Sequence, residues 1–276
     1  LSAGLMVLGV TAVFGSFGPV IAVSALPANL NQTFASGERI LRLLEEQPEV
    51  EAVENGAELS YEDLEVHDLS FAYGDTPIFS GLSLTAHPGD IIGVTGPVAC
   101  GKSTLGKAFL CELPYTGSIR YGSQEMAGMT DAEHCGVVGY LGDDPELLSD
   151  SIRNNILLGR DDDAWKYLRA VCLEDEVKAM PNGLDTCVGD GGVRLSGGQQ
   201  QRLALARTLA HPRPLLVLDD PFSALDRKTE EQVFDNLRKM TAGSTVLLIS
   251  HRLYLFPQMD GVLWIQAVSY THLRAH

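Results

Sequence analysis

The sequence predicts an α/β fold in which a mostly parallel sheet carries a phosphate-binding loop. Three segments in a fixed order support this prediction: GPVACGKST at 96–104, LSGGQQQR at 195–202 and LLVLDD at 215–220. The first follows an apolar strand pattern and precedes a helix, the second opens a helix, and the third is a buried strand that ends in two carboxylates. Together they predict a site for the phosphates and the metal ion of a nucleotide.

The N-terminal part of the chain predicts a membrane helix. Residues 1–37 carry no charge, and a membrane helix needs ~20 mostly apolar residues, so we expect residues 1–34 to form one. A signal peptide would need basic residues and a shorter apolar core, and a buried helix of a soluble protein is the other alternative. Residues 35–61 are expected to continue as an amphipathic helix, which Pro48 ends, and then as an acidic linker.

The loop at 96–104 has the spacing G-x-x-x-x-G-K-[ST] and follows the strand pattern DIIGVTG, which is the required context of a P-loop. Its glycines are Gly96 and Gly101. We expect the backbone N–H groups from Ala99 to Thr104 to hold phosphates, Lys102 to neutralise the β- and γ-phosphates, and Ser103 to ligate Mg²⁺. Asp219, at the end of the third segment, is expected to add a carboxylate to this metal site.

Charge and cysteine usage exclude several other classes of protein. The chain has 20 Lys and Arg against 36 Asp and Glu, so its formal charge of −16 would repel a polyanion, and we do not expect a nucleic-acid partner. The five cysteines are odd in number and contain no C-x-x-C pair, which argues against a disulfide framework and a zinc site. They are typical of reduced cytosolic thiols.

These motifs resemble the ATP-binding cassette of ABC transporters, from about residue 64 to 265. Tyr73 before the P-loop, SALD at 223–226 and His251 after the strand pattern VLLIS follow in the order of that family. The resemblance implies a P-loop NTPase fold with a RecA-like core, an antiparallel β piece at about 64–86 and a helical subdomain at about 145–194. The cassette is thereby assigned to residues 62–266.

The resemblance also implies roles outside the P-loop. Tyr73 would stack on adenine, His251 would contact the γ-phosphate, and Asp226 would lie at the seam between two subunits. The signature helix start would bind the phosphate of an ATP carried by another subunit, through Ser196, Gly197, Gly198 and Gln199. A strand tyrosine packed in the core, and a core histidine with satisfied hydrogen bonds, are the structural alternatives for the first two.

Three positions depart from the family pattern. Ala99, between Gly96 and Gly101, stands where the family pattern has a third glycine. Asp143 stands where a glutamine contacts the metal and the attacking water, and Asp220 replaces the catalytic glutamate. Aspartate is one methylene shorter than glutamate, so a water that it holds would lie ~1 Å or more out of reach, which can cost ~10²-fold in rate. Asp220, His251 and Asp143 are the catalytic candidates, and Asp143 joins Ser103 and Asp219 as a metal candidate.

The function implied by the resemblance is ATP binding and hydrolysis that drive export by one half of an ABC transporter. ATP and Mg²⁺ would be its ligands, and the cassette would lie on the cytoplasmic side of the cell membrane. All departures fall on the P-loop side and none on the signature, so we expect a heterodimer with a second half-transporter. A subunit that binds ATP but hydrolyses it poorly, and a soluble ABC protein of DNA repair or translation, are the alternatives.

The two ends of the chain carry expectations of their own. The chain begins without Met and offers one membrane helix where an exporter half has six, so we expect a C-terminal fragment. Residues 267–276 contain VSYTHLRAH, which resembles a translated sequencing adapter, and we expect this tail to be non-native, without fold or function. A weak similarity of the N-terminal region to exporters of thiols or amino acids is the only indication of a substrate.

Overall fold

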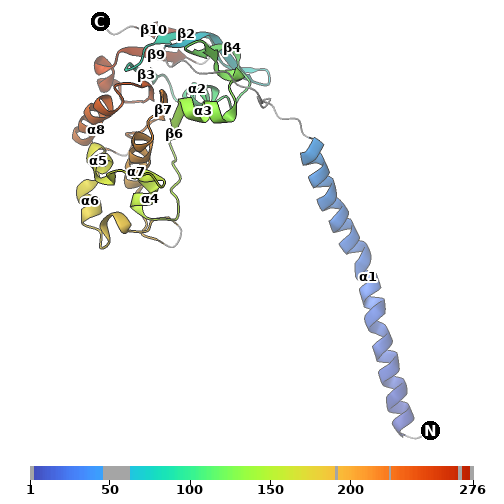
Figure 1. Cartoon of the computed structure of the whole chain (residues 1–276). Coiled ribbons are helices and arrows are strands. Elements are labelled where there is room, and N and C mark those ends of the chain that lie inside the picture. The colour runs from blue at the N-terminus through green and yellow to red at the C-terminus, as the bar shows by residue number, and fades with distance from the viewer. Residues whose placement is uncertain (1–2, 46–62, 190–191, 224, 267–268, 274–276) are drawn as a thin grey trace. The chain divides into compact units, whose positions relative to one another are not determined.

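The computed structural model describes residues 3–45, 63–189, 192–223, 225–266 and 269–273. The chain divides into two compact units, Leu1–Glu49 and Val50–His276, and each is described by itself (Figure 1). The described part of the first unit is a single long helix. The second contains two sheets and the remaining helices, and it holds the residues that the sequence analysis assigned to the site.

The first unit is helix α1 (Ala3–Glu45), which joins the predicted membrane helix and most of its amphipathic extension in one element. Its apolar side chains at Leu5, Leu8 and Phe14 are exposed. Over the described residues, however, no helix combines the length and the apolar character that a membrane crossing demands. The membrane span therefore stays a prediction, and the acidic linker predicted after Pro48 lies outside the described residues.

One sheet of the second unit is antiparallel and has the strand order β2-β1-β4-β5. It consists of β1 (Leu64–Tyr73), β2 (Thr76–Ala86), β4 (Thr116–Tyr121) and β5 (Gln124–Glu125). The first two strands pair as a hairpin, from Leu64 opposite Ala86 to Tyr73 opposite Thr76. This hairpin confirms the predicted antiparallel piece, whereas β4 and β5 return from beyond the P-loop and extend it.

The other sheet has the order β10-β9-β3-β8-β7-β6 and is parallel from β9 to β6. Its strands are β3 (Ile91–Thr95), β6 (Val138–Leu141), β7 (Leu215–Asp219), β8 (Thr245–Ile249), β9 (Gly261–Gln266) and β10 (Ser269–Leu273). Every residue of β3, β7 and β8 is buried, as expected of parallel strands that are covered on both faces. The predicted parallel core is confirmed, and its carboxyl ends share one edge.

The sequence predicts no fold for residues 267–276. The structure instead pairs β10 antiparallel with β9, from Ser269 opposite Gln266 to Leu273 opposite Val262. An alternation of residues such as SYTHL can complete a ladder through its backbone alone, because each extended residue offers an N–H and a carbonyl. Whether this tail is native to the protein stays a prediction.

The predicted helical subdomain is present as α4 (Ile152–Leu157), α5 (Ala164–Ala170), α6 (Glu174–Lys178) and the short 3₁₀ turn η2 (Gly183–Asp185). These pack with α7 (Gly197–Ala210), as Figure 1 shows. Their buried side chains join one face of the parallel sheet in a single apolar cluster, which includes Leu168, Leu203 and Leu216. The antiparallel sheet packs with the other face, in a cluster that includes Phe79 and Val217.

The remaining helices flank the parallel strands. They are α2 (Lys102–Phe109), α3 (Asp131–Val137), α8 (Arg227–Met240) and two 3₁₀ segments, η1 (Met126–Gly128) and η3 (Leu253–Gln258). Helix α2 directly follows the loop after β3, and α8 leads from the end of β7 to β8. The loops that leave the carboxyl ends of β3, β6, β7 and β8 consequently meet at one edge, where open α/β sheets place their ligands.

Candidate functional site

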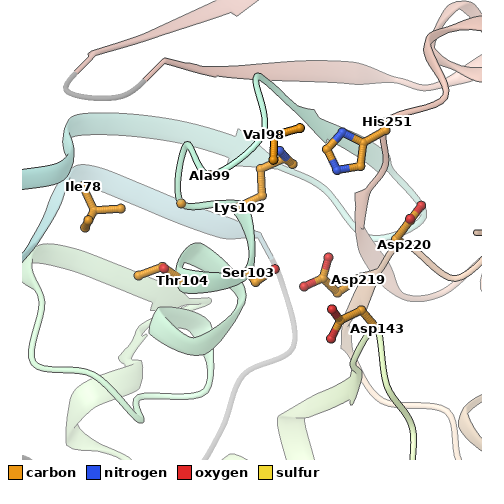
Figure 2. A pocket seen from close by; sticks show the side chains of 11 residues that line it. Ile78, Val98, Ala99, Lys102, Ser103, Thr104, Asp143, Asp219, Asp220 and His251 are labelled. Atoms are coloured by element: carbon orange, nitrogen blue, oxygen red, sulfur yellow. The ribbon is translucent and has the colours of Figure 1, made fainter.

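A cleft of ≈ 310 Å³ lies at this edge of the parallel sheet (Figure 2). Nine of its lining residues are predicted by the sequence, and the structure brings them together from the P-loop and the ends of β6, β7 and β8. Ile78 of β2 and Val98 of the P-loop complete the wall. The nine predicted residues are Ala99, Gly101, Lys102, Ser103, Thr104, Asp143, Asp219, Asp220 and His251.

The path of the P-loop depends on its two glycines. A Cβ added to Gly96 would lie 2.1 Å from the carbonyl oxygen of Ile265. Gly101 caps the start of α2 with a φ of 94°, and a Cβ there would lie 2.3 Å from Cγ2 of Ile78. No other residue type fits these two positions without moving a neighbouring strand, because only glycine lacks the Cβ.

Ala99, the first departure from the family pattern, also has a left-handed backbone, with a φ of 62°. Glycine adopts this conformation freely, whereas an L-residue pays roughly 1–2 kcal/mol for the approach of its Cβ to the next carbonyl. The loop therefore keeps the backbone path that a glycine would give it, and the substitution places a methyl group on the wall of the cleft.

Lys102 is the first residue of α2 and is only 6 % exposed. Its Nζ donates to the carbonyl oxygens of Gly96, at 3.1 Å, and Pro97, at 2.8 Å, so the side chain folds back along the loop. The first N–H groups of α2 have no partner within the helix, and the helix dipole adds partial positive charge there. A buried ammonium beside free N–H groups makes this part of the cleft an anion site.

The opposite wall is acidic. Asp219, the last residue of β7, is 4 % exposed and has a buried Oδ2 without a hydrogen-bond partner, and the Ser103 side chain lines the same cleft. Burial raises the pKa of Asp219, and the charges of Asp143 and Asp220 raise it further, whereas the Ser103 side chain and the charge of Lys102 lower it. A buried, unpaired carboxylate oxygen next to a hydroxyl is a suitable ligand set for a divalent cation.

Asp220 continues from β7 with a φ of 45°, and its N–H donates to the carbonyl oxygen of Ile249 at 2.9 Å. This bond holds the ends of β7 and β8 together. Burial raises the pKa of Asp220, and the proximity of His251 and Arg252 lowers it. His251 is exposed and, in Figure 2, its ring lies on the side of the cleft that carries Asp220, across from the P-loop.

Two predicted site residues, Tyr73 and Asp226, lie outside the cleft. Tyr73 is 52 % exposed and stacks edge-on against Phe71, with ring centroids 4.7 Å apart, while Ile78 takes the place on the cleft wall. Asp226 accepts hydrogen bonds from the N–H groups of Lys228 and Thr229, so its side chain caps helix α8. In this subunit neither residue lines the cleft.

The signature segment forms the start of α7, also away from the cleft. Ser196 is the N-cap: its Oγ accepts from the N–H of Gln199 at 3.3 Å, and the Gln199 side chain accepts from the N–H of Ser196 at 2.9 Å. This reciprocal capping box fixes the helix start. Gln199 also donates to Glu176 at 2.7 Å, which anchors the segment to the helical subdomain. Ser196 and Gly197 are exposed, so the capped end faces outward.

A buried ion pair that the sequence analysis missed ties two of these loops together. Glu230 is fully buried and accepts hydrogen bonds from Arg252 and from the hydroxyl of Tyr254. Arg252 also donates to the carbonyl oxygens of Leu225, at 2.9 Å, and Ser223, at 2.8 Å. The one available signal was spacing, because Glu230 shares the buried face of α8 with the residues at i+3, i+4 and i+7: Val233, Phe234 and Leu237.

Comparison with known proteins places this geometry in a family. Residues 79–223 match the family model described as "ABC transporter". A probable ABC transporter ATP-binding/permease protein of Haemophilus influenzae is 33 % identical over 94 % of this chain and 48 % of the relative. An ATP-dependent lipid A-core flippase of Desulfotalea psychrophila is 32 % identical over 88 % of this chain and 44 % of the relative.

A solved structure is also similar to this chain. It is described as a bacterial Atm1-family ABC exporter with ATP bound, and it shares 28 % sequence identity with a TM-score of 0.80. The match covers 100 % of this chain and 50 % of that one. The chain thus spans about half the length of the curated relatives that it matches.

Proposed function

This chain belongs to the ABC transporter family, and we propose that it binds Mg-ATP in the cleft at the end of the parallel sheet and uses ATP hydrolysis to power export. The observation that carries this proposal is the meeting of a buried lysine, free helix N–H groups and an unpaired buried carboxylate oxygen in one cleft. The first two recognise phosphate, and the third calls for a cation. Mg-ATP provides both.

The residues present fit Mg²⁺ as the metal of this site. Ser103 and Asp219 would hold it, with Asp143 beside them, and it would offset the charge of the β- and γ-phosphates. Among the described residues, no group of three or more His, Cys, Asp or Glu side chains is arranged to hold a metal ion. Mg²⁺ commonly takes one or two carboxylates from the protein and completes its shell with phosphates and waters, and the cleft offers such carboxylates.

The chain's own groups have separate tasks in this proposal. Lys102 and the N–H groups of residues 99–104 bind and orient the phosphates, and His251 contacts the terminal one. Asp220 is the candidate to accept a proton from the attacking water, and its raised pKa favours this task. Its side chain is short, however, so a water that it holds would lie farther from the phosphorus than one held by a glutamate. We therefore propose weak hydrolysis at this site.

We further propose that the chain acts with a different half-transporter. The three departures, Ala99, Asp143 and Asp220, all line one cleft, whereas the signature start at Ser196 is intact and faces outward. In a head-to-tail pair, this signature would complete the ATP site of the partner. A hydrolysis-poor subunit that serves as an ATP clamp is the second candidate, supported by the same three positions.

Attachment to the membrane is proposed from the N-terminal unit. Its first 37 residues carry no charge, and apolar side chains of α1 such as Leu5 and Phe14 are exposed. Exposed apolar surface of this kind is covered in the working protein by lipid or by other helices. The cassette would then face the cytoplasm, because that is where ATP is available. The described residues do not indicate which substrate is transported.

The test of the proposed function is protection of the fold by the nucleotide. At a hundredfold excess over Kd, a ligand that binds only the folded state stabilises it by ~2.7 kcal/mol. We expect Mg-ATP to raise the melting temperature of the unsubstituted chain and Lys102→Ala to abolish this increase. Thermal denaturation with and without Mg-ATP measures it.

Lys107→Ala is the matched control for this test, because Lys107 lies in the same helix but is exposed and outside the cleft. It should keep the full protection by Mg-ATP. Equal protection of the Lys102→Ala variant and the unsubstituted chain would show that ATP binds elsewhere, or that the observed stabilisation is non-specific.

A further inference from the structure

Asp143 adds a third carboxylate to the cleft beside Asp219 and Asp220, which makes the environment of a bound nucleotide more negative. We propose that Asp143 strengthens the dependence of ATP binding by this chain on a divalent cation, because its charge weakens the binding of the metal-free nucleotide. The inference rests on the proposed function and specifies which form of the nucleotide the cleft accepts. It assigns Asp143 a role in ligand selection, distinct from any part in hydrolysis.

The sheet places Asp143 beside the metal position. Strand β6 pairs in parallel with β7, with Leu141 opposite Leu218, so the residues that follow each strand leave the sheet side by side. Figure 2 shows the carboxylates of Asp143 and Asp219 on the same wall of the cleft, opposite the P-loop. Asp143 is exposed to the cleft rather than packed in the core. Its charge therefore acts on whatever enters.

The balance of charge in the cleft is negative. Asp143, Asp219 and Asp220 face Lys102 and His251, and the Lys102 ammonium already donates to two carbonyl oxygens of its own loop. The charge of Asp143 raises the pKa of both other carboxyl groups, Asp219 and Asp220. A glutamine at this position would leave two carboxylates instead of three. The cleft therefore repels a metal-free polyphosphate more strongly than it would with the glutamine of the family pattern.

Asp219 supplies the independent sign that a cation is expected here. Its Oδ2 is buried and has no hydrogen-bond partner, so the folded chain leaves this oxygen to be satisfied by something that enters the cleft. Metal-free ATP brings only further negative oxygens. With Mg-ATP, Ser103 and Asp219 would hold the cation with Asp143 beside them, and its charge would offset the repulsion between the phosphates and the three carboxylates.

The size of the effect follows from Coulomb's law. Two unit charges ~6 Å apart, at an effective dielectric constant of ~40, change an equilibrium by about tenfold. Binding coupling is reciprocal, so the factor by which Mg²⁺ tightens ATP is also the factor by which ATP tightens Mg²⁺. Removing the charge of Asp143 should lower this coupling factor by about tenfold, chiefly because metal-free ATP then binds more tightly.

The experiment measures the Kd of ATP twice for each protein, once with excess Mg²⁺ and once with EDTA, by competition with a fluorescent ATP analogue. The variants are Asp143→Asn, which is isosteric and uncharged, and Asp143→Gln, which restores the family residue. Asp144→Asn is the matched control, since Asp144 is exposed, adjacent in sequence and outside this cleft. In a third arm, Mn²⁺ is titrated without nucleotide and followed by electron paramagnetic resonance.

We expect the ratio of the EDTA Kd to the Mg²⁺ Kd to fall about tenfold in both Asp143 variants and to stay unchanged in Asp144→Asn. Mn²⁺ alone should show no saturable binding, because a hard divalent cation held by one or two protein carboxylates needs the nucleotide phosphates to complete its shell. A ratio within twofold of that of the unsubstituted chain would overturn the inference, as would tight binding of Mn²⁺ without nucleotide. Absence of Mg-ATP binding to the unsubstituted chain would instead overturn the proposed function.

Discussion

Ser196→Arg is expected to nearly eliminate the ATPase activity of this chain reconstituted with its partner half-transporter, whereas Asp220→Asn should have a small effect. Ser196 caps α7 at an exposed end, where it would contact the phosphate of the ATP held by the partner. A bulky side chain there blocks the approach of the two subunits. In the proposed asymmetric pair, Asp220 would serve the weaker site, so its loss would remove little of the total activity.

Two further variants separate the contact from the stability of the helix. Ser196→Asp keeps an N-cap but opposes a phosphate with negative charge, so it should remove activity without unfolding α7. Thr130 heads α3 with the same kind of capping box, and Thr130→Arg should lose ~1 kcal/mol of stability yet keep the ATPase activity. If Asp220→Asn proves as damaging as Ser196→Arg, Asp220 is a working base and the asymmetric account is wrong.

Glu230→Ala should lower the free energy of unfolding by about 3 kcal/mol, the low end of the range for breaking a buried ion pair from one side. Glu230 is fully buried, and its removal leaves the partly buried Arg252 and the Tyr254 hydroxyl without their shared acceptor. We place the value at the low end because Arg252 retains the carbonyl oxygens of Ser223 and Leu225. Urea denaturation measures the change.

The same helix provides the control for this prediction. Glu231 pairs with Arg227 at 3.1 Å, and both side chains are exposed, so Glu231→Ala should cost less than about 1 kcal/mol. Equal and small effects of the two substitutions would show that the buried pair contributes no more than a surface pair. Equal and large effects would point to the helix itself, through its propensity or its packing.

The gathering of Lys102, Asp219 and His251 in one cleft could be predicted because it is encoded locally. The P-loop spacing, the apolar run before Asp219 and the strand pattern before His251 each specify a strand end, and parallel strand ends meet at one edge of a sheet. Ala99 and Asp143 were identified from their places in the motif order, and the structure puts both on the wall of the same cleft. The family and the fold were likewise predicted.

Other features depend on contacts that no local pattern encodes. Strands β4 and β5 join the first hairpin only after the chain has passed through the P-loop helix, so their pairing is a tertiary outcome. Tyr73 is exposed rather than packed in the core, and its stacking on adenine stays a prediction, whereas the place of Ile78 on the cleft wall is set by the hairpin and has no local sequence signal. The local sequence around Glu230 is typical of a surface charge, because its partners Arg252 and Tyr254 lie 22 and 24 residues further along the chain.

Amide hydrogen exchange of the intact chain, with and without saturating Mg-ATP, tests the central claim most directly, because it locates the nucleotide as well as detecting it. Exchange should slow at the N–H groups of residues 99–104 and in the loops after β6, β7 and β8, and Lys102→Ala should remove this protection. Unchanged exchange at residues 99–104 under saturating Mg-ATP, or protection confined to other segments, would contradict the assignment of this cleft as the ATP site.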